Sequence, residues 1–432
     1  MTQSWFLKRQ AVSLYPDPAR VVVRPFRPAT EPRHLNPTEK SRAEHIIDRV
    51  LQLDATAAEE KLQEVLEDFE GRHRRLMDVF DVQAEGVQDT LQPFHNLSEV
   101  QRCLIGAYFL HEYSFEASAL FNPSMVADPD QSNAPEGGCR FILSLRAVGE
   151  GHISSITFRS GTVAADGSIA IETPTGLASV PDIQSHVAGN NGDEVELIFN
   201  HGDTLCERVI FPVTGAQANG LEDARFVKFD DDSRQVYYAT YTAYSGRQIR
   251  SELLETEDFK SFRLTPLGGR AAHNKGMALF PRKIKGRYAM IARHDNENLY
   301  LIYSDDLYNW EGGEPILQPE YPWEFVQIGN CGSPIELDDC WLLLTHGVGA
   351  VRKYAIGAVL LDKEDPSKVL ARSREPLIRP DPKEREGYVP NVVYTCGAMR
   401  HGERIILPYG VSDTFTNFAT IEIRDLMQAM TD

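Results

Sequence analysis

The pattern of hydrophobic and polar positions changes twice along the chain. Residues 1–36 are rich in proline and arginine and show little periodicity, which predicts an extended arm. Apolar residues then recur at helical spacing from Ile46 onward, and after Phe121 they alternate in short strands separated by turns. We therefore expect an arm at 1–36, a helical segment at 37–120 and a β domain at 121–432.

Capping signatures divide the helical segment into three expected helices. Each combines a cap residue with an acid or amide three residues further on; they are Asn36-Pro37-Thr38-Glu39, Thr56 with Glu59, and Ser98 with Gln101. The second opens one apolar stripe from Leu62 to Phe80, and the third opens a helix from Val100 to about Leu120. These stripes are expected to pack on the main domain or on a second subunit, and a membrane or partner surface is the alternative.

Similar units recur after Phe121 at a spacing of about 55 residues. Each begins with a small or apolar strand, crosses a polar turn and enters a second apolar strand; the four clearest begin at Ala224, Met277, Ser333 and Asn391. A more divergent unit runs from Phe141 to Ile169. Because radial repetition shields sheet edges, this pattern predicts a mostly β fold, a five-bladed β-propeller preceded by an N-terminal helical segment. A β-sandwich or β-solenoid is the competing fold.

Composition narrows the possible partners. The 432 residues include 63 acidic and 44 basic side chains, a net charge of −19, which opposes binding to nucleic acid or anionic lipid. The sequence shows no signal peptide and no apolar run of membrane-spanning length, so we expect a cytoplasmic protein. Its six cysteines form no CxxC motif and no Cys/His cluster, which argues against a zinc site and a disulfide framework.

Polar side chains recur where the expected inner strands begin and where their neighbours end. At the starts stand Glu222, Asp223, Arg225, Asn274 and Lys275, with Glu336 inside a first strand; Tyr241, Arg293, Asp295, His346 and Asp413 follow second strands. In a propeller these positions converge on one funnel. Carboxylates, basic groups and an imidazole are typical of a carbohydrate site with an acid that protonates a leaving oxygen. For each residue alone, a turn former or a satisfied hydrogen-bond partner is the alternative.

The segment Gly220-Leu221-Glu222-Asp223-Ala224-Arg225 resembles the Gly-x-Glu-Asp-Pro-Arg motif of glycoside hydrolase family 130, with alanine in the proline position. Three further blocks match in order: Tyr241-Thr242-Ala243, Asn274 to Pro281, and Tyr409 to Thr414. This family comprises inverting β-mannoside phosphorylases and β-mannosidases on five-bladed propellers, and the resemblance covers about 120–432.

The resemblance implies roles for individual residues. Asp223 is the general acid, which in the phosphorylases acts through a substrate hydroxyl. Asp413 holds the mannosyl unit, and Asn122, Arg146 and Arg159 are weaker matches to sugar-binding residues. No metal or organic cofactor is implied.

Departures from the family pattern bear on the reaction. The phosphorylases bind inorganic phosphate with two arginines, a lysine and a histidine; these positions hold Lys275, Arg293, Glu336 and His346 here. A carboxylate at 336 repels phosphate, so we expect Glu336 to be the base of an inverting hydrolase, about 6.5–9.5 Å from the acid. Asp295 and Glu297 are alternative bases, and a structural ion pair with Lys275 or Arg293 is the alternative role for Glu336.

The sequence thus predicts an inverting β-mannosidase for short β-mannosides, with the 1,2-linkage expected by analogy alone. The first alternative is a phosphorylase that uses inorganic phosphate as co-substrate and releases α-mannose 1-phosphate. A non-catalytic carbohydrate-binding propeller is the second. A homo-oligomer formed through the N-terminal helices is a further expectation.

Overall fold

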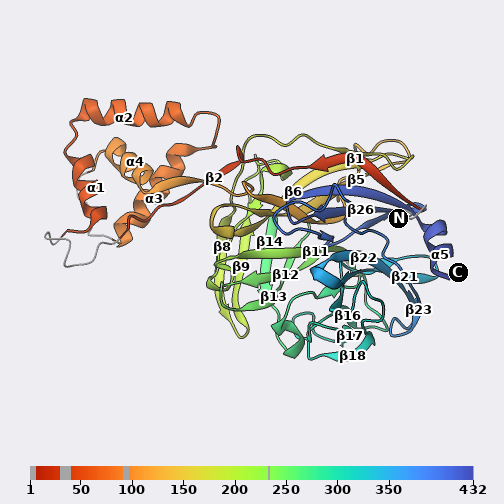
Figure 1. Ribbon diagram of the computed structural model, residues 1–432. Coiled ribbons are helices and arrows are strands. Elements are labelled where there is room, and N and C mark those ends of the chain that lie inside the picture. The colour runs from red at the N-terminus through yellow and green to blue at the C-terminus, as the bar shows by residue number, and fades with distance from the viewer. Residues whose placement is uncertain (1–5, 30–39, 91–96, 232–233, 432) are drawn as a thin grey trace. The chain divides into compact units, whose positions relative to one another are not determined.

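A computed structural model describes residues 6–29, 40–90, 97–231 and 234–431, which separate into two compact units (Figure 1). The larger unit comprises 1–18, 115–175 and 180–432, and the smaller comprises 19–114 with 176–179. In chain order, the smaller unit therefore lies between the first strand of the larger unit and the rest of it.

An 11-stranded sheet contains the first half of the larger unit, in the order β4-β5-β6-β11-β12-β13-β14-β9-β8, with β7 and β10 both paired to β6. Its strands are β4 (Ala119–Ala127), β5 (Cys139–Val148), β6 (Ser154–Val163), β7 (Ile169–Ile171), β8 (Asp182–Gly189), β9 (Gly192–Ile198), β10 (Val209–Ile210), β11 (Gly220–Asp231), β12 (Arg234–Tyr244), β13 (Ile249–Thr256) and β14 (Ser261–Pro266). A single parallel pair, Gly220 with Ser154, joins β11 to β6. The sheet is thus two antiparallel groups with one narrow junction.

Three further sheets follow in chain order. One contains β15 (Ala278–Leu279), β16 (Tyr288–Ala292), β17 (Leu299–Ser304) and β18 (Gly313–Leu317). The next contains β19 (Gln327–Asn330), β20 (Ile335–Glu336), β21 (Cys340–Val348), β22 (Tyr354–Asp362) and β23 (Val369–Arg372). The last contains β24 (Val393–Tyr394), β25 (Met399–His401), β26 (Arg404–Val411), β27 (Phe415–Glu422) and β1 (Leu7–Leu14), and helix α5 (Ile423–Thr431) follows β27.

The expected strand pairs are present in all five units of the sequence. The pairs are β5 with β6, β11 with β12, β15 with β16, β20 with β21, and β24 with β26. Buried apolar residues from neighbouring groups form the clusters between the sheets; for example, Phe280 of one group packs against Trp341 of the next, with ring centroids 5.1 Å apart. The alternation of apolar and polar positions therefore correctly identified these paired strands.

The sequence predicted an extended arm at 1–36, and the described part of it contains two extended strands that pair with later segments of the chain. β1 pairs antiparallel with β27, so the red N-terminal strand lies beside the blue C-terminal strands in Figure 1. A second early strand, β2 (Val21–Pro25), belongs to the smaller unit. The proline- and arginine-rich composition hid both strands because their partners lie about 90–400 residues away in the chain, beyond the reach of local pattern.

The described residues of the smaller unit, 19–29, 40–90 and 97–114, contain four helices where the sequence predicted three. They are α1 (Arg42–Leu51), α2 (Ala55–Asp68), α3 (Leu76–Thr90) and α4 (Glu99–Tyr108), accompanied by β2 paired with β3 (Leu110–Ser114). The stripe from Leu62 to Phe80 is split between α2 and α3, because Gly71 and Arg75 adopt left-handed conformations with φ of 73° and 53°. The helix expected to reach Leu120 ends at Tyr108, because the next residues pair with β2.

The capping predictions had mixed outcomes. Ser98 and Gln101 form the expected capping box, whereas α2 is capped by Asp54, two residues before the predicted cap Thr56. Asn36 to Glu39 lie outside the described residues, and Ser41 caps α1. No helix in the described ranges is both long and apolar enough to span a membrane.

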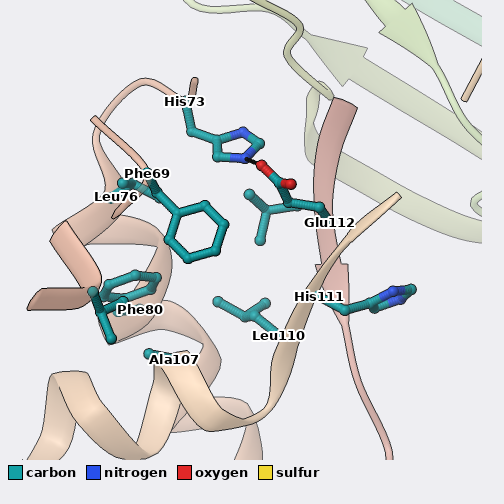
Figure 2. A pocket seen from close by; sticks show the side chains of 10 residues that line it. Phe69, His73, Leu76, Phe80, Ala107, Leu110, His111 and Glu112 are labelled. Atoms are coloured by element: carbon teal, nitrogen blue, oxygen red, sulfur yellow. Dashed lines mark hydrogen bonds and ion pairs between the residues drawn. The ribbon is translucent and has the colours of Figure 1, made fainter. Parts of the chain in front are cut away.

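The smaller unit contains a small, partly open apolar pocket of about 60 Å³ (Figure 2). Phe69, Leu76, Phe80 and Leu110 line it, and His73 closes one side through a 2.7 Å hydrogen bond from Nε2 to Glu112 Oε1. Small-molecule sites usually measure about 300–1,000 Å³. This pocket is too small and too apolar to hold a sugar ring, so it is not a candidate for the carbohydrate site.

Close packing of α3 against α4 makes Gly106 a sensitive position. A Cβ at residue 106 would lie 1.8 Å from the backbone oxygen of Phe80, which cannot move aside as a side chain can. We expect Gly106→Ala to destabilise the helical unit by about 1–3 kcal/mol. Thermal unfolding of the full chain, followed by far-ultraviolet circular dichroism, measures this loss.

Gly86→Ala is the matched control within the same pair of helices. A Cβ at residue 86 has no atom within 4 Å, so this change is expected to stabilise α3 by about 0.5–1 kcal/mol. Equal unfolding temperatures for the two variants would contradict the packing of α3 on α4.

Candidate active site

Asp223 and Asn122 occupy equivalent bulges at the starts of β11 and β4. The register of each strand against its partner shifts at this point, and the two residues have φ of 55° and 47°. Left-handed backbone is strained for residues with a Cβ, and a bulge turns a side chain out of the usual alternation. The two side chains consequently meet: Asn122 Nδ2 donates a 2.6 Å hydrogen bond to Asp223 Oδ1.

Several cations surround the buried carboxylate of Asp223. Arg146 donates from Nη1 to Asp223 Oδ1 at 3.2 Å and from Nη2 to Glu222 Oε1 at 2.5 Å. Lys275 Nζ lies 3.8 Å from Glu222 Oε2. Burial alone would raise the pKa of Asp223, but Arg146, Arg225 and Lys275 outweigh it and hold the pKa at about 2. At neutral pH Asp223 is therefore ionised, and it can donate a proton only after the surrounding charge changes.

Arg225 follows Asp223 by two residues in β11, and it is 1% exposed. It donates to the backbone oxygens of Cys331 at 3.0 Å and Asp223 at 3.2 Å, and to the Tyr394 hydroxyl at 2.7 Å. All three acceptors are uncharged. Arg225 thus links residues from three strand groups. Within the described part of the chain it forms no ion pair, although its charge lowers the pKa of the nearby Asp223 carboxyl.

Arg293 is a second buried guanidinium, 7% exposed, and it is wedged between two glycines. A Cβ on Gly276 would lie 2.5 Å from Arg293 Nε, and one on Gly329 would lie 3.0 Å from Arg293 Cδ and 2.3 Å from His346 Cε1. Gln327 adjoins the same group, and its amide oxygen accepts from Arg293 when the amide is oriented to satisfy both ends. Glycine at both positions is therefore required for Arg293 and His346 to approach each other.

The charge of Arg293 is not compensated within the described part of the chain. Arg293 forms no ion pair there, and its Nε and the Nδ1 of His346 are buried without hydrogen-bond partners. Burial, together with repulsion from Arg225, lowers the pKa of Arg293, and burial beside the two arginines lowers the pKa of His346 well below its usual value. The result is a cluster with two buried cations and a neutral imidazole, which suits an oxyanion.

Asp413 lies in the turn between β26 and β27. Ser412 and Asp413 are both left-handed, with φ of 47° and 49°. Burial raises the pKa of Asp413 to about 6, with Asp223 and Glu222 adding to the rise and Arg146 and Arg352 opposing it. Asp413 is thus electrostatically coupled to the Asp223 cluster, and it titrates near neutral pH.

The structure does not bring Glu336 to this cluster, so the prediction that it faces Asp223 is wrong. Glu336 pairs with Trp341 in the β20–β21 register, five residues before His346, a separation of about 17 Å along a strand. Its carboxylate receives Arg282 Nη2 and Lys363 Nζ, each at 2.9 Å. It lies beside a different groove, of about 310 Å³, whose lining includes Lys228 and Arg400.

Four other predicted residues have structural partners of their own. Arg159 pairs with buried Glu116 at 3.0 Å, and Tyr241 hydrogen-bonds Glu252 and Gln217 within the core. Asp295 accepts from the backbone of Glu297 and Asn298 and from the Tyr300 hydroxyl. Asn274 holds the backbone of Lys275 and His294. Glu297, an alternative base, is exposed, and its backbone oxygen accepts from Ile328. These contacts correspond to the structural alternatives weighed for single polar residues.

Sequence reasoning missed three residues at the cluster, namely Tyr394, Gln327 and Arg352. Tyr394 ends an expected inner strand, so its position in the repeat was available as a signal. Gln327 and Arg352 lie outside the repeated segments, and no pattern in the sequence pointed to them. The described residues contain no group of three or more His, Cys, Asp or Glu side chains placed to hold a metal ion.

Known proteins resemble this chain in sequence and in fold. Residues 200–432 match a family described as beta-1,4-mannooligosaccharide phosphorylase. A 1,2-beta-oligomannan phosphorylase from Thermoanaerobacter sp. is 38% identical over 224 residues, which cover 49% of this chain and 72% of that protein.

Two solved structures share the fold. The beta-1,2-mannobiose phosphorylase from Listeria innocua, in complex with beta-1,2-mannobiose, has a TM-score of 0.53 and 23% identity over 73% of this chain and 92% of its own. A second, from work on glycoside hydrolases within this family that target beta-1,2 mannosidic linkages in Candida mannan, has a TM-score of 0.52 and 19% identity, covering 72% and 87%. The fold is therefore the mostly β fold of these structures, and the chain belongs to glycoside hydrolase family 130, the mannoside phosphorylase family.

Proposed function

We propose that the protein is a β-mannoside phosphorylase, which cleaves short β-mannosides with inorganic phosphate and releases α-mannose 1-phosphate. The observation that carries this proposal is the pair of buried guanidinium groups, Arg225 and Arg293, beside neutral His346; neither forms an ion pair with any carboxylate of the residues that the structure describes. A buried charge is costly unless it is paired, so this arrangement favours a bound anion. Two of the proteins named above, from Thermoanaerobacter sp. and Listeria innocua, are phosphorylases of β-1,2-linked mannosides, and β-1,2-linked substrates are proposed on that basis.

We also propose that the strand groups of the larger unit are the blades of a five-bladed propeller. Hydrogen bonds between the first strands of different groups support it: Phe226 N donates to Ser124 Oγ at 2.9 Å, and Cys396 N to the Pro123 oxygen at 2.8 Å. The second bond connects the last group to the first. The innermost strands then surround one axis, with Asp223 and the cation cluster towards one end.

The proposed reaction inverts the anomeric carbon. A phosphate oxygen attacks that carbon from the face opposite the leaving sugar, so a C–O bond to phosphate forms as the glycosidic C–O bond breaks. The leaving oxygen receives a proton that originates on Asp223 and passes through a substrate hydroxyl. Asn122 and Arg146 orient the Asp223 carboxyl, and Asp413 binds the mannosyl unit.

Phosphate has a second effect in this scheme. Arg225 helps to hold the pKa of Asp223 at about 2, and a dianion beside Arg225 and Arg293 offsets that positive charge. Phosphate binding therefore raises the pKa of Asp223 and favours the protonated acid that catalysis needs. Phosphate, the nucleophile, thus also favours the protonated form of Asp223, the general acid.

The proposal predicts that cleavage of β-1,2-mannobiose requires phosphate. We expect α-mannose 1-phosphate and mannose in equal amounts when phosphate is present, and little turnover without it. Quantifying both products by chromatography tests this. Release of two mannose molecules at the same rate without phosphate would replace phosphorolysis by hydrolysis, the reaction associated with the second solved structure.

Glu336→Gln is the matched control for the mode of cleavage. Because Glu336 pairs with Arg282 and Lys363, this variant is expected to leave the rate and the product ratio unchanged. Loss of activity in Glu336→Gln would show that the carboxylate acts in the reaction and would restore the hydrolytic hypothesis.

A further inference from the structure

Strand β1 places a half-buried arginine, Arg9, against the last sheet. Arg9 stands opposite Ala419 in the β1–β27 register, and its guanidinium contacts four residues of other segments. Two of these contacts are peripheral: the Arg379 backbone oxygen lies 3.5 Å from Nη2, and Asp381 Oδ2 lies 3.8 Å from Nη1. Nε donates to the Tyr409 hydroxyl at 3.1 Å, and Nη2 donates to Glu384 Oε2 at 2.9 Å. An arginine from the start of the chain thus contacts the strand and the loop that lie next to Asp413.

Glu384 is a buried carboxylate, 5% exposed, at the centre of this network. Its Oε1 accepts from the Tyr409 hydroxyl at 2.9 Å and from Asn417 Nδ2 at 3.2 Å, while Arg9 supplies the compensating charge. Removing the cationic partner of a buried carboxylate strongly destabilises the folded protein, because the carboxylate is left buried without a compensating charge. The position of Glu384 therefore depends on Arg9.

The loop that begins at Glu384 holds both neighbours of Asp413. Ser412 Oγ donates to the Glu384 backbone oxygen at 2.8 Å, and Val389 N donates to the Ser412 oxygen at 2.9 Å. Tyr388 N donates to Thr414 Oγ1 at 2.8 Å. Because Ser412 and Asp413 are left-handed, this turn keeps its strained conformation only while its surroundings fix it.

We propose that Arg9 and Glu384 are positioning residues for the sugar site: β1 fixes Glu384 through Arg9, and Glu384 fixes the turn that presents Asp413 to the mannosyl unit. The inference rests on the proposed function, because it takes Asp413 as a substrate ligand. It gives the N-terminal strand a role in substrate affinity, although β1 is separated from the remaining strands of its sheet by the whole helical unit in the chain.

Arg9→Met tests the proposal through separate Michaelis constants for the two substrates. We expect KM for the mannoside to rise by about tenfold, because charged hydrogen bonds that fix Asp413 are lost. The phosphate KM is expected to stay within twofold, because Arg225 and Arg293 lie on other strands. Arg404→Met is the matched control: Arg404 Nε pairs with Glu422 at 2.6 Å in the same sheet and makes no contact with the Asp413 turn, so neither KM should change.

The double variant Arg9→Met with Glu384→Gln separates positioning from stability. Removing the uncompensated carboxylate should restore the unfolding temperature towards that of the wild type, while the mannoside KM stays raised. An unchanged mannoside KM in Arg9→Met, or equal rises in both KM values, would overturn the proposal, as would recovery of the mannoside KM in the double variant. The mannoside KM is measured in whichever cleavage the wild type performs, so failure of phosphorolysis is recognised separately.

Discussion

Asp223→Asn is expected to lower the rate of mannoside phosphorolysis by about 10²- to 10⁴-fold, the usual contribution of a general acid. The amide keeps the size of the carboxyl but has no proton to give to the leaving oxygen. Arg146 retains its partner Glu222, and Arg225 retains the Tyr394 hydroxyl, so the fold is expected to survive. Steady-state kinetics with β-1,2-mannobiose and phosphate measure the loss.

The leaving group provides a sharper test of this role. The nitrophenolate of a nitrophenyl β-mannoside leaves without needing a proton. The rate loss caused by Asp223→Asn should therefore be much smaller with this substrate than with mannobiose. Equal losses with both substrates would indicate that Asp223 binds the sugar and another group supplies the proton. Full activity with mannobiose would remove Asp223 from the mechanism, whereas no activity in the wild type would favour a non-catalytic carbohydrate-binding protein.

The parts of the site that were predictable from the sequence are those where neighbouring residues in the chain determine the position of the side chain. Asp223 was identified from its motif and Asn122 from the family resemblance; each is followed by residues that continue a strand, and both adopt the same bulge. Their convergence follows once the strands pair side by side. Arg293 and His346 were placed correctly beside each other for a similar reason, since each lies near the end of the second strand of its unit.

Glu336 shows where this reasoning stops. A position in a repeated block identifies the strand, but it does not say how far along the strand a side chain lies. β20 is two residues long and pairs with Trp341, so its register places Glu336 beside Arg282 and Lys363 rather than beside His346. Strand length and register depend on long-range pairing, which no local pattern in the sequence specifies.

Polar residues at strand ends were the other source of error. Arg159 and Tyr241 point into the core, where Glu116 and Glu252 satisfy them, and both partners lie on other segments of the chain. A buried ion pair and a catalytic cation look the same in a sequence, because the difference is the presence of a partner nearby in space. The uncompensated charge of Arg293 therefore became visible only in the structure.

Arg293→Met is expected to raise the phosphate KM by about 10²- to 10³-fold, equivalent to about 3–4 kcal/mol, because it removes charge-assisted hydrogen bonds to the anion in a buried site. Methionine fills similar space between Gly276 and Gly329 without a charge, so the mannoside KM should change little. Measuring each KM with the other substrate saturating tests this separation.

A glycine substitution tests the same cluster without altering any charge. In Gly329→Ala the new Cβ would lie 2.3 Å from His346 Cε1, which forces His346 and Arg293 apart, and the phosphate KM should again rise. Gly202→Ala, where a Cβ has no atom within 4 Å, is the control and should behave as the wild type. If Arg293→Met and Gly329→Ala both kept the wild-type phosphate KM, phosphate would have to bind elsewhere. The uncompensated charge of Arg293 would then no longer support phosphorolysis.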